Sequence, residues 1–144
     1  MQPEENRQNR RRLEDHPERR KYILKKEIRG GYGISGSIYE VQEEKSALSE
    51  AVSALAPLSL TLTRSADHEY YGQLPESVDV NGTRQTSRVE AGGIYYFQAW
   101  NAFSLNFRDM DISPYKVYVI GKTDAQAVAE LEKAGQSLTV DILE

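Results

Sequence analysis

The sequence is dominated by short segments in which apolar residues recur at every second position. The clearest is residues 58–63 (LSLTLT), which places three leucines on one side of an extended chain. Residues 103–108 and 137–143 repeat the pattern. Such alternation is typical of β-strands with one face in a core. The chain is therefore expected to bury these faces in a sandwich or barrel.

Four further segments are predicted to be strands from their β-branched and aromatic content: residues 22–28, 34–41, 94–98 and 115–120. Two short helices are predicted as well. Residues 46–55 carry Leu48, Val52 and Leu55 at helical spacing after the N-cap Ser46, and Asp124 caps a second helix through Ala134. The predicted fold class is mainly β, a small closed β-barrel with two short helices, because closure removes exposed strand edges.

With 144 residues, the chain has room for one domain. Residues 1–21 contain too little apolar surface to fold and are predicted to be a disordered basic arm, with residues 22–144 as the barrel domain. Residues 1–29 hold ten Lys/Arg against six Asp/Glu, whereas residues 30–144 hold eight against sixteen. This acidic balance argues against nucleic-acid binding by the domain and leaves it only to the arm.

Several chemistries are excluded or disfavoured by composition. Cysteine is absent, which excludes disulfides and thiolate chemistry. No catalytic or phosphate-binding motif occurs, and no cofactor or metal site is expected. His68, between Asp67 and Glu69, is interpreted as part of a solvated turn. No run of about 20 apolar residues and no apolar leader segment is present, so a cytoplasmic location without a membrane partner is predicted.

Aromatic residues supply the candidate site. Ten of the thirteen aromatic residues lie between positions 70 and 118. An aromatic-lined pocket with a few polar groups is typical of small-molecule and peptide sites, although alternation also assigns several of these rings to the core. The long polar loop that ends near Ala91 favours a functional role in the same region.

Five residues are predicted to bind the ligand: Tyr70, Tyr96, Trp100, Asn101 and Arg108. Trp100 and Asn101 fall in a tight turn between two strands, where a large ring either rims a pocket or plugs one end of the barrel. Arg108 either holds a carboxylate or carbonyl oxygen by a forked hydrogen bond or forms a surface ion pair.

Three groups of residues carry a resemblance to a known family. They are the run LAPLSLTLTRSADHEYYGQLPESV, the segment EAGGIYYFQAWNAFSLNFRD, and YKVYVIGKTD. In this order and spacing they resemble the small, largely uncharacterised bacterial cyclophilin-like domain family, from about Ala47 to Glu144. The Gly-rich stretch KEIRGGYGISGSIYEVQ stands where such domains have an opening hairpin, and the basic arm has no counterpart.

The resemblance implies a barrel related in shape to cyclophilins, which are peptidyl-prolyl isomerases. Shape alone does not carry activity, and the Phe-His-Arg context of the cyclophilin catalytic arginine does not occur here. The predicted function is binding of a small molecule or extended peptide in the aromatic-lined pocket. The alternatives are a peptidyl-prolyl isomerase with Arg108 as hydrogen-bond donor, and an adaptor that contacts nucleic acid through its basic arm.

Overall fold

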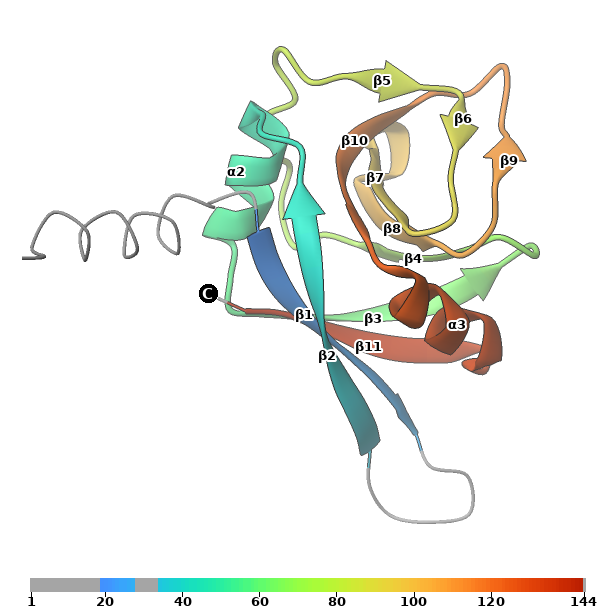
Figure 1. Ribbon diagram of the computed structural model, residues 1–144. Coiled ribbons are helices and arrows are strands. Elements are labelled where there is room, and N and C mark those ends of the chain that lie inside the picture. Colours follow the sequence, from blue (N-terminus) through green and yellow to red (C-terminus); the bar gives the residue numbers. More distant parts are fainter. Residues whose placement is uncertain (1–18, 28–33, 144) are drawn as a thin grey trace, which may run out of the picture.

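A computed structural model describes residues 19–27 and 34–143, which form a strongly curled β-sheet with two helices (Figure 1). The long strands are β1 (Arg19–Glu27), β2 (Ile34–Glu43), β3 (Leu58–Ser65), β4 (Glu69–Gln73), β7 (Gly93–Phe97), β8 (Ala102–Asn106), β10 (Val117–Thr123) and β11 (Ser137–Ile142). The two-residue strands are β5 (Gln85–Thr86), β6 (Arg88–Val89) and β9 (Met110–Asp111). The helices are α2 (Ala47–Ala54) and α3 (Ala125–Lys133), with a 3-10 turn η1 (Gln98–Trp100).

The main sheet has nine strands in the order β2-β1-β11-β3-β4-β8-β7-β10-β5, and β6 and β9 form a separate pair. All registered pairs are antiparallel. β1 and β2 form a hairpin that is in register from Arg19↔Gln42 to Glu27↔Ile34. The strands predicted over residues 22–28 and 34–41 are therefore confirmed, and they pair with each other although a Gly-rich stretch separates them.

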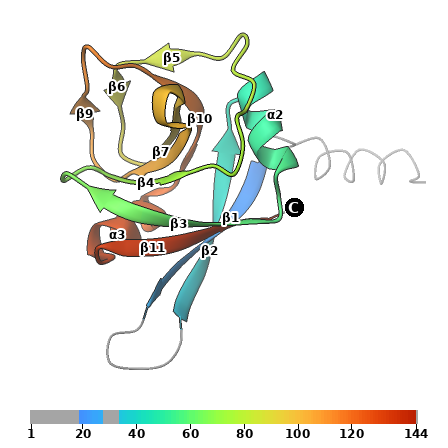
Figure 2. The same ribbon diagram turned by 180° about the vertical axis from the view of Figure 1, so that it is seen from behind.

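The mainly-β class and the two short helices are confirmed, but the closed barrel is not. The sheet curls like half a barrel, and the pairing that would close it, between β10 and β2, covers only three residue pairs, Gly121↔Glu43 to Thr123↔Val41. The physical reason is that the rest of β2 leaves β10 and extends with β1 away from the other strands (Figures 1 and 2).

The contact between β10 and β2 depends on a glycine. A Cβ atom at Gly121 would lie 2.4 Å from the carbonyl oxygen of Gln42 and 2.8 Å from the Cα of Glu43. Real Cβ contacts are not this short. Only a residue without a side chain therefore allows the two backbones to pair at this point.

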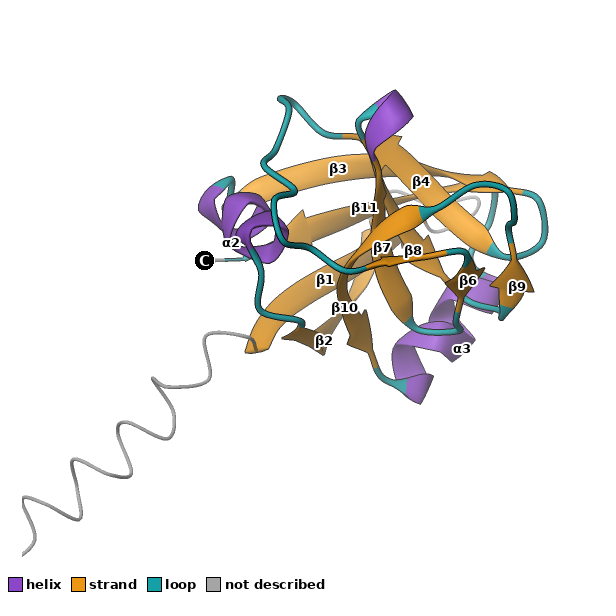
Figure 3. Cartoon of the chain, turned by 90° about the horizontal axis from the view of Figure 1, so that it is seen from above, coloured by secondary structure: helices purple, strands orange, loops and turns teal. Residues whose placement is uncertain are grey.

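Both helices begin at the predicted caps. The Ser46 hydroxyl accepts a hydrogen bond from the Ser49 amide at 3.1 Å, and the Ser49 hydroxyl accepts one from the Ser46 amide at 3.0 Å. The Asp124 carboxylate accepts a hydrogen bond from the Ala127 amide at 2.9 Å. Reciprocal and single caps of this kind satisfy amides that the first helical turn leaves unpaired. The two helices lie on opposite sides of the molecule (Figure 3).

The core lies on the concave side of the sheet. Leu60, Leu105 and Val140, from three different strands, are all buried there, as the alternation predicts. Leu48 and Val52 of α2 and Leu131 of α3 join the same cluster; the large rings in it are Tyr22, Tyr70, Tyr96, Phe103 and Phe107. One face of each long strand therefore stabilises the fold, which leaves the other face available for a site.

Some boundaries differ from the sequence-based expectation. β1 begins at Arg19, because residues 19–21 pair with β2, so three residues assigned to the arm belong to a strand. The remainder of the predicted arm, residues 1–18, lies outside the described residues. β10 begins at Val117, two residues later than expected. β4 and the two-residue strands β5 and β6 stand where the sequence indicated turn and loop.

Candidate ligand-binding cavity

A cavity of about 520 Å³ lies on the face of the sheet opposite the core. Its floor is formed by β4 and β8, and residues from β6, β7, β10 and the segments beside β9 line its walls. β8 shows why the strand has two different faces. Phe103 and Leu105 point into the core, whereas Ala102, Ser104 and Asn106 line the cavity. Successive side chains of a strand point to opposite sides, so one strand serves both.

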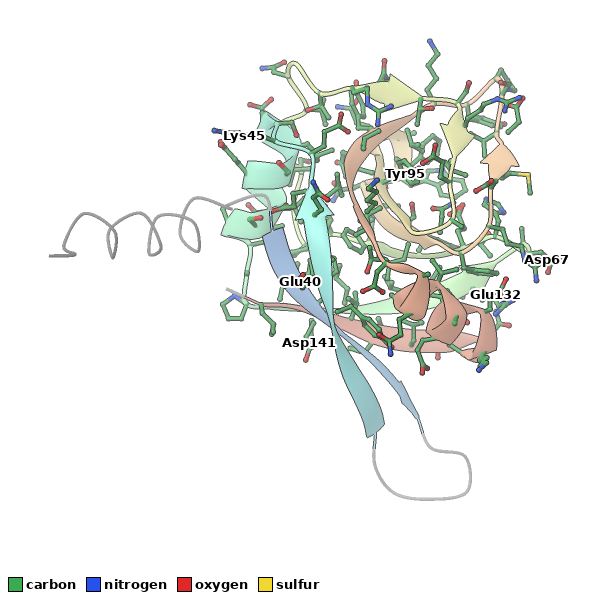
Figure 4. The ribbon with its side chains drawn as sticks, viewed as in Figure 1. Glu40, Lys45, Asp67, Tyr95, Glu132 and Asp141 are labelled. Atoms are coloured by element: carbon green, nitrogen blue, oxygen red, sulfur yellow. The ribbon has the colours of Figure 1, made fainter. Side chains whose placement is uncertain are left out.

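The segment from β5 to β9 covers this outer face of the sheet. β6 and β9 pair through Arg88↔Asp111 and Val89↔Met110, and the Ile112 amide donates a hydrogen bond to the Ser87 carbonyl at 2.8 Å. Beneath them, a second apolar cluster unites Val89, Tyr95, Val117 and Val119, with Phe97 and Ile112 partly buried against it. Figure 4 shows Tyr95 within the ring of ribbons that β5, β6, β9 and β10 outline in that view. The polar loop thus becomes a cover over the convex side of the sheet.

Four aromatic side chains form a continuous rim, defined by Tyr71, Phe97, Trp100 and Tyr115. The Phe97 ring meets Trp100 edge-on at 5.2 Å between centroids and Tyr115 at 6.2 Å, and Tyr71 lies 6.1 Å from Trp100. Trp100 and Tyr115 are 62% and 63% exposed. Large rings that remain this exposed while packed on each other are typical of a binding surface.

Polar side chains gather at the floor of the cavity: His68, Glu69, Ser104 and Asn106. Asn106 is 1% exposed, and neither its Oδ1 nor its Nδ2 has a hydrogen-bond partner among the described residues. Most buried polar groups in native proteins are paired, since an unpaired one costs about 1–3 kcal/mol. The Asn106 amide is therefore an unpaired buried group in a residue that lines the cavity.

His68 and Glu69 form a contact inside the cavity. The His68 Nε2 lies 3.0 Å from a carboxylate oxygen of Glu69, and His68 is 9% exposed. Burial raises the pKa of Glu69, and the nearby His68 opposes that rise. The interpretation of His68 as part of a solvated turn is wrong, because the backbone carbonyl of His68 accepts a hydrogen bond from the Phe107 amide at 2.8 Å and the turn is held against the sheet.

Of the five predicted ligand-binding residues, Trp100 lines this cavity. Tyr70 lies in the core with no exposed surface; its hydroxyl is 2.7 Å from the Ala134 carbonyl and accepts a hydrogen bond from Arg64 at 3.2 Å. Tyr70 therefore links β4 to the end of α3. It does not reach the cavity.

Tyr96 and Asn101 contact each other, but neither lines the cavity, and their contact holds a loop. The buried Tyr96 hydroxyl donates a hydrogen bond to Asn101 Oδ1, and Asn101 Nδ2 donates to the carbonyl oxygens of Leu74 and Glu76, both at 3.1 Å. Asn101 has a left-handed backbone with φ of 51°, a conformation that asparagine tolerates well. The pair ties the loop after β4 to the turn before β8.

Arg108 lies outside the cavity. Its Nε is 3.4 Å from a carboxylate oxygen of Glu132 on α3, which Figure 4 labels, and its guanidinium lies 5.6 Å from the Phe107 ring centre. Both partners of this ion pair are about half exposed, so its contribution to stability is small, below about 1 kcal/mol. The surface-pair interpretation of Arg108 fits this geometry. The structure does not bring the arginine to the aromatic rim.

In the described part of the chain, no three His, Asp or Glu side chains gather as a metal-binding group. Within the same residues, no helix is long and apolar enough to span a membrane.

Comparison with known proteins agrees with this architecture. The family described as the Cyclophilin-like family matches residues 33–143 of the 144-residue chain. No curated protein matches the sequence. The match covers the curled sheet from β2 to β11, both helices and every residue of the cavity. The chain belongs to the cyclophilin-like family.

Proposed function

We propose that this protein binds a small molecule or an extended peptide segment in the cavity between β4, β8 and the β6–β9 pair. The observation that carries the proposal is the unpaired, buried Asn106 amide beneath an exposed aromatic rim. Ligand sites are usually concave, mostly apolar and furnished with a few convergent polar groups, and they occupy about 300–1,000 Å³. The cavity has each of these properties, and its volume falls in that range.

The chain provides its own probe, because Trp100 is its only tryptophan and lies on the rim. Fragment screening by amide NMR, with Trp100 emission as a second readout, is expected to find neutral aromatic fragments that shift resonances near residues 68–71, 97–106 and 112–117. Shifts confined to other surfaces, or no binder in the screen, would overturn the proposal.

Rim variants provide the control. Trp100→Ala and Tyr115→Ala are expected to weaken fragment binding severalfold, because each removes an exposed ring that lines the cavity. Met110→Ala removes another exposed large apolar side chain, which does not line the cavity. Its binding should remain that of the parent chain. Equal losses in all three variants would indicate a general surface effect and not a site.

A further inference from the structure

The chemistry of the cavity narrows the class of ligand that it selects. We infer that the cavity recognises an uncharged group that presents an N–H donor and a carbonyl acceptor side by side, the edge of an amide, on an aromatic or apolar frame. This inference rests on the proposed function, since it concerns the same cavity. It adds which chemical group the polar residues at the floor of the cavity recognise.

The amide of Asn106 defines the complementary group. A carboxamide offers one acceptor oxygen and one donor nitrogen, and here both atoms are buried without a partner among the described residues. Rotating the amide by 180° exchanges the positions of its oxygen and nitrogen. In either orientation the ligand must offer one hydrogen-bond donor and one acceptor next to each other. A ligand with only acceptors or only donors would leave one of the two atoms unpaired, at a cost of about 1–3 kcal/mol.

Charge in the cavity argues against an anion. The described lining residues include one carboxyl group, that of Glu69, and no lysine or arginine, and the imidazole of His68 is already in contact with that carboxyl group. A carboxylate or phosphate entering the cavity would lose hydration without gaining an opposite charge. The Glu69 carboxylate already has His68 at 3.0 Å, so it does not require a cationic ligand either. The remaining class is neutral.

The aromatic rim explains why the part of the ligand that carries the amide group should be aromatic or apolar. Phe97 presents its ring between those of Trp100 and Tyr115, and both contacts are edge-to-face. Aromatic and apolar ligand groups gain from contact with such rings, because exposed apolar surface is removed from water. The nearby Val89, Ile112 and Val117 continue the apolar wall.

A series of four benzene derivatives tests the inference on the full chain by NMR titration. Benzamide carries the amide edge, benzoate replaces it by an anion, benzamidine by a cation, and N,N-dimethylbenzamide lacks the donor. Each of the other three leaves one of the two Asn106 atoms unpaired, and one net hydrogen bond of about 1 kcal/mol corresponds to a preference for benzamide of about fivefold. In Asn106→Leu this preference should disappear, whereas Asn81→Leu, an exposed asparagine outside the cavity, should retain it.

The outcomes separate this inference from the proposed function. If benzoate or benzamidine binds most tightly, or if all four compounds bind the parent chain equally, recognition of an amide edge is overturned. The proposed function, ligand binding in this cavity, then still stands. Toluene, which has the aromatic ring but no amide group, is added as a further compound. If none of the compounds binds, both the inference and the proposed function are overturned. N-acetylphenylalanine N-methylamide, which carries peptide amides, is titrated beside benzamide. Binding of either compound that is lost in Asn106→Leu supports the inference. The compound that binds more tightly indicates whether the ligand is a peptide or a small molecule.

Discussion

Glu69 on β4 lies directly opposite Asn106 on β8, and both side chains line the cavity. Residues opposed in an antiparallel pair share a face of the sheet, and their Cβ atoms are within reach of each other. Their situations nevertheless differ. Glu69 has a carboxylate oxygen 3.0 Å from the Nε2 of His68, whereas the amide of Asn106 has no hydrogen-bond partner among the described residues. This asymmetry has measurable consequences for stability.

Replacing Asn106 by leucine is expected to stabilise the protein. The change removes an unpaired buried amide and fills its place with an apolar side chain of similar size, which raises the free energy of unfolding by about 1–3 kcal/mol. Urea unfolding monitored by circular dichroism measures the effect, with Asn81→Leu as the exposed control. A destabilised Asn106→Leu variant would show that the amide is paired after all.

Glu69→Gln is expected to remove a pH dependence of stability. The pKa of Glu69 in the folded protein is raised above its ordinary value of 4.5 by burial, with His68 opposing. The folded state therefore holds this proton more tightly than the unfolded chain. The resulting stabilisation is fully present below pH 4.5 and is lost as the pH rises through the folded pKa. Unfolding free energies from pH 3.5 to 8 should fall less steeply in Glu69→Gln.

The matched control for that series is Glu76→Gln, which removes an exposed carboxylate outside the cavity. If the pH profile of Glu69→Gln coincided with that of the parent chain while Glu76→Gln changed it, burial of the Glu69 carboxyl group would be refuted.

Tyr96→Phe is expected to loosen the loop after β4. It removes the hydrogen bond to Asn101, the residue that holds the Leu74 and Glu76 carbonyls. A net hydrogen bond contributes about 0.5–1.5 kcal/mol, so the free energy of unfolding should fall by that amount. Tyr118→Phe is the control, because Tyr118 is the cross-strand neighbour of Tyr96 and its hydroxyl makes no hydrogen bond to the described residues. Equal losses in both variants would contradict a specific role for the Tyr96 hydroxyl.

Gly121→Ala is expected to weaken the junction between β10 and β2. Its Cβ would overlap backbone atoms of Gln42 and Glu43, which cannot move as a flexible side chain can. Overpacking of this kind costs about 1–3 kcal/mol. Gly135→Ala is the matched control, because nothing lies within 4 Å of a Cβ atom there. Thermal unfolding of the two variants tests the difference, and an unaltered melting temperature in Gly121→Ala would contradict it.

The fold is predictable from sequence where the signal is local. Strict alternation predicts β3 and β11, and the capping residues Ser46 and Asp124 predict the starts of both helices. β4 is harder to predict, because its five residues include Gly72 and no run of alternating aliphatic side chains. The two-residue strands depend entirely on distant partners, as β5 does on Val117 and Tyr118. No local pattern can indicate them.

The candidate site was only partly predictable, for a related reason. Trp100 is identified by its place in a tight turn. In the pairs Tyr70–Tyr71 and Tyr96–Phe97, however, the two rings point to opposite faces, and nothing local says which one faces the core. The sequence-based hypothesis selects Tyr70 and Tyr96, whereas the cavity is lined by Tyr71 and Phe97.

The polar floor could not be recognised from sequence. His68 and Asn106 belong to a turn and to an outward strand face, and such positions normally meet solvent. Here they are covered because they lie in a cavity that Val89 of β6 and Ile112, next to β9, also line, and Val89 is distant in sequence from both. Predicting their burial requires the path of the connecting segment, which alternation and composition do not describe.

The departure of β2 from β10 has a consequence for backbone dynamics. Over residues 34–40, β2 is paired with β1 but with no other described strand. In an antiparallel edge strand, successive amides point alternately toward the partner and toward water. Hydrogen–deuterium exchange should therefore be slow and fast at alternate residues along this stretch, and uniformly slower where β2 reaches Val41.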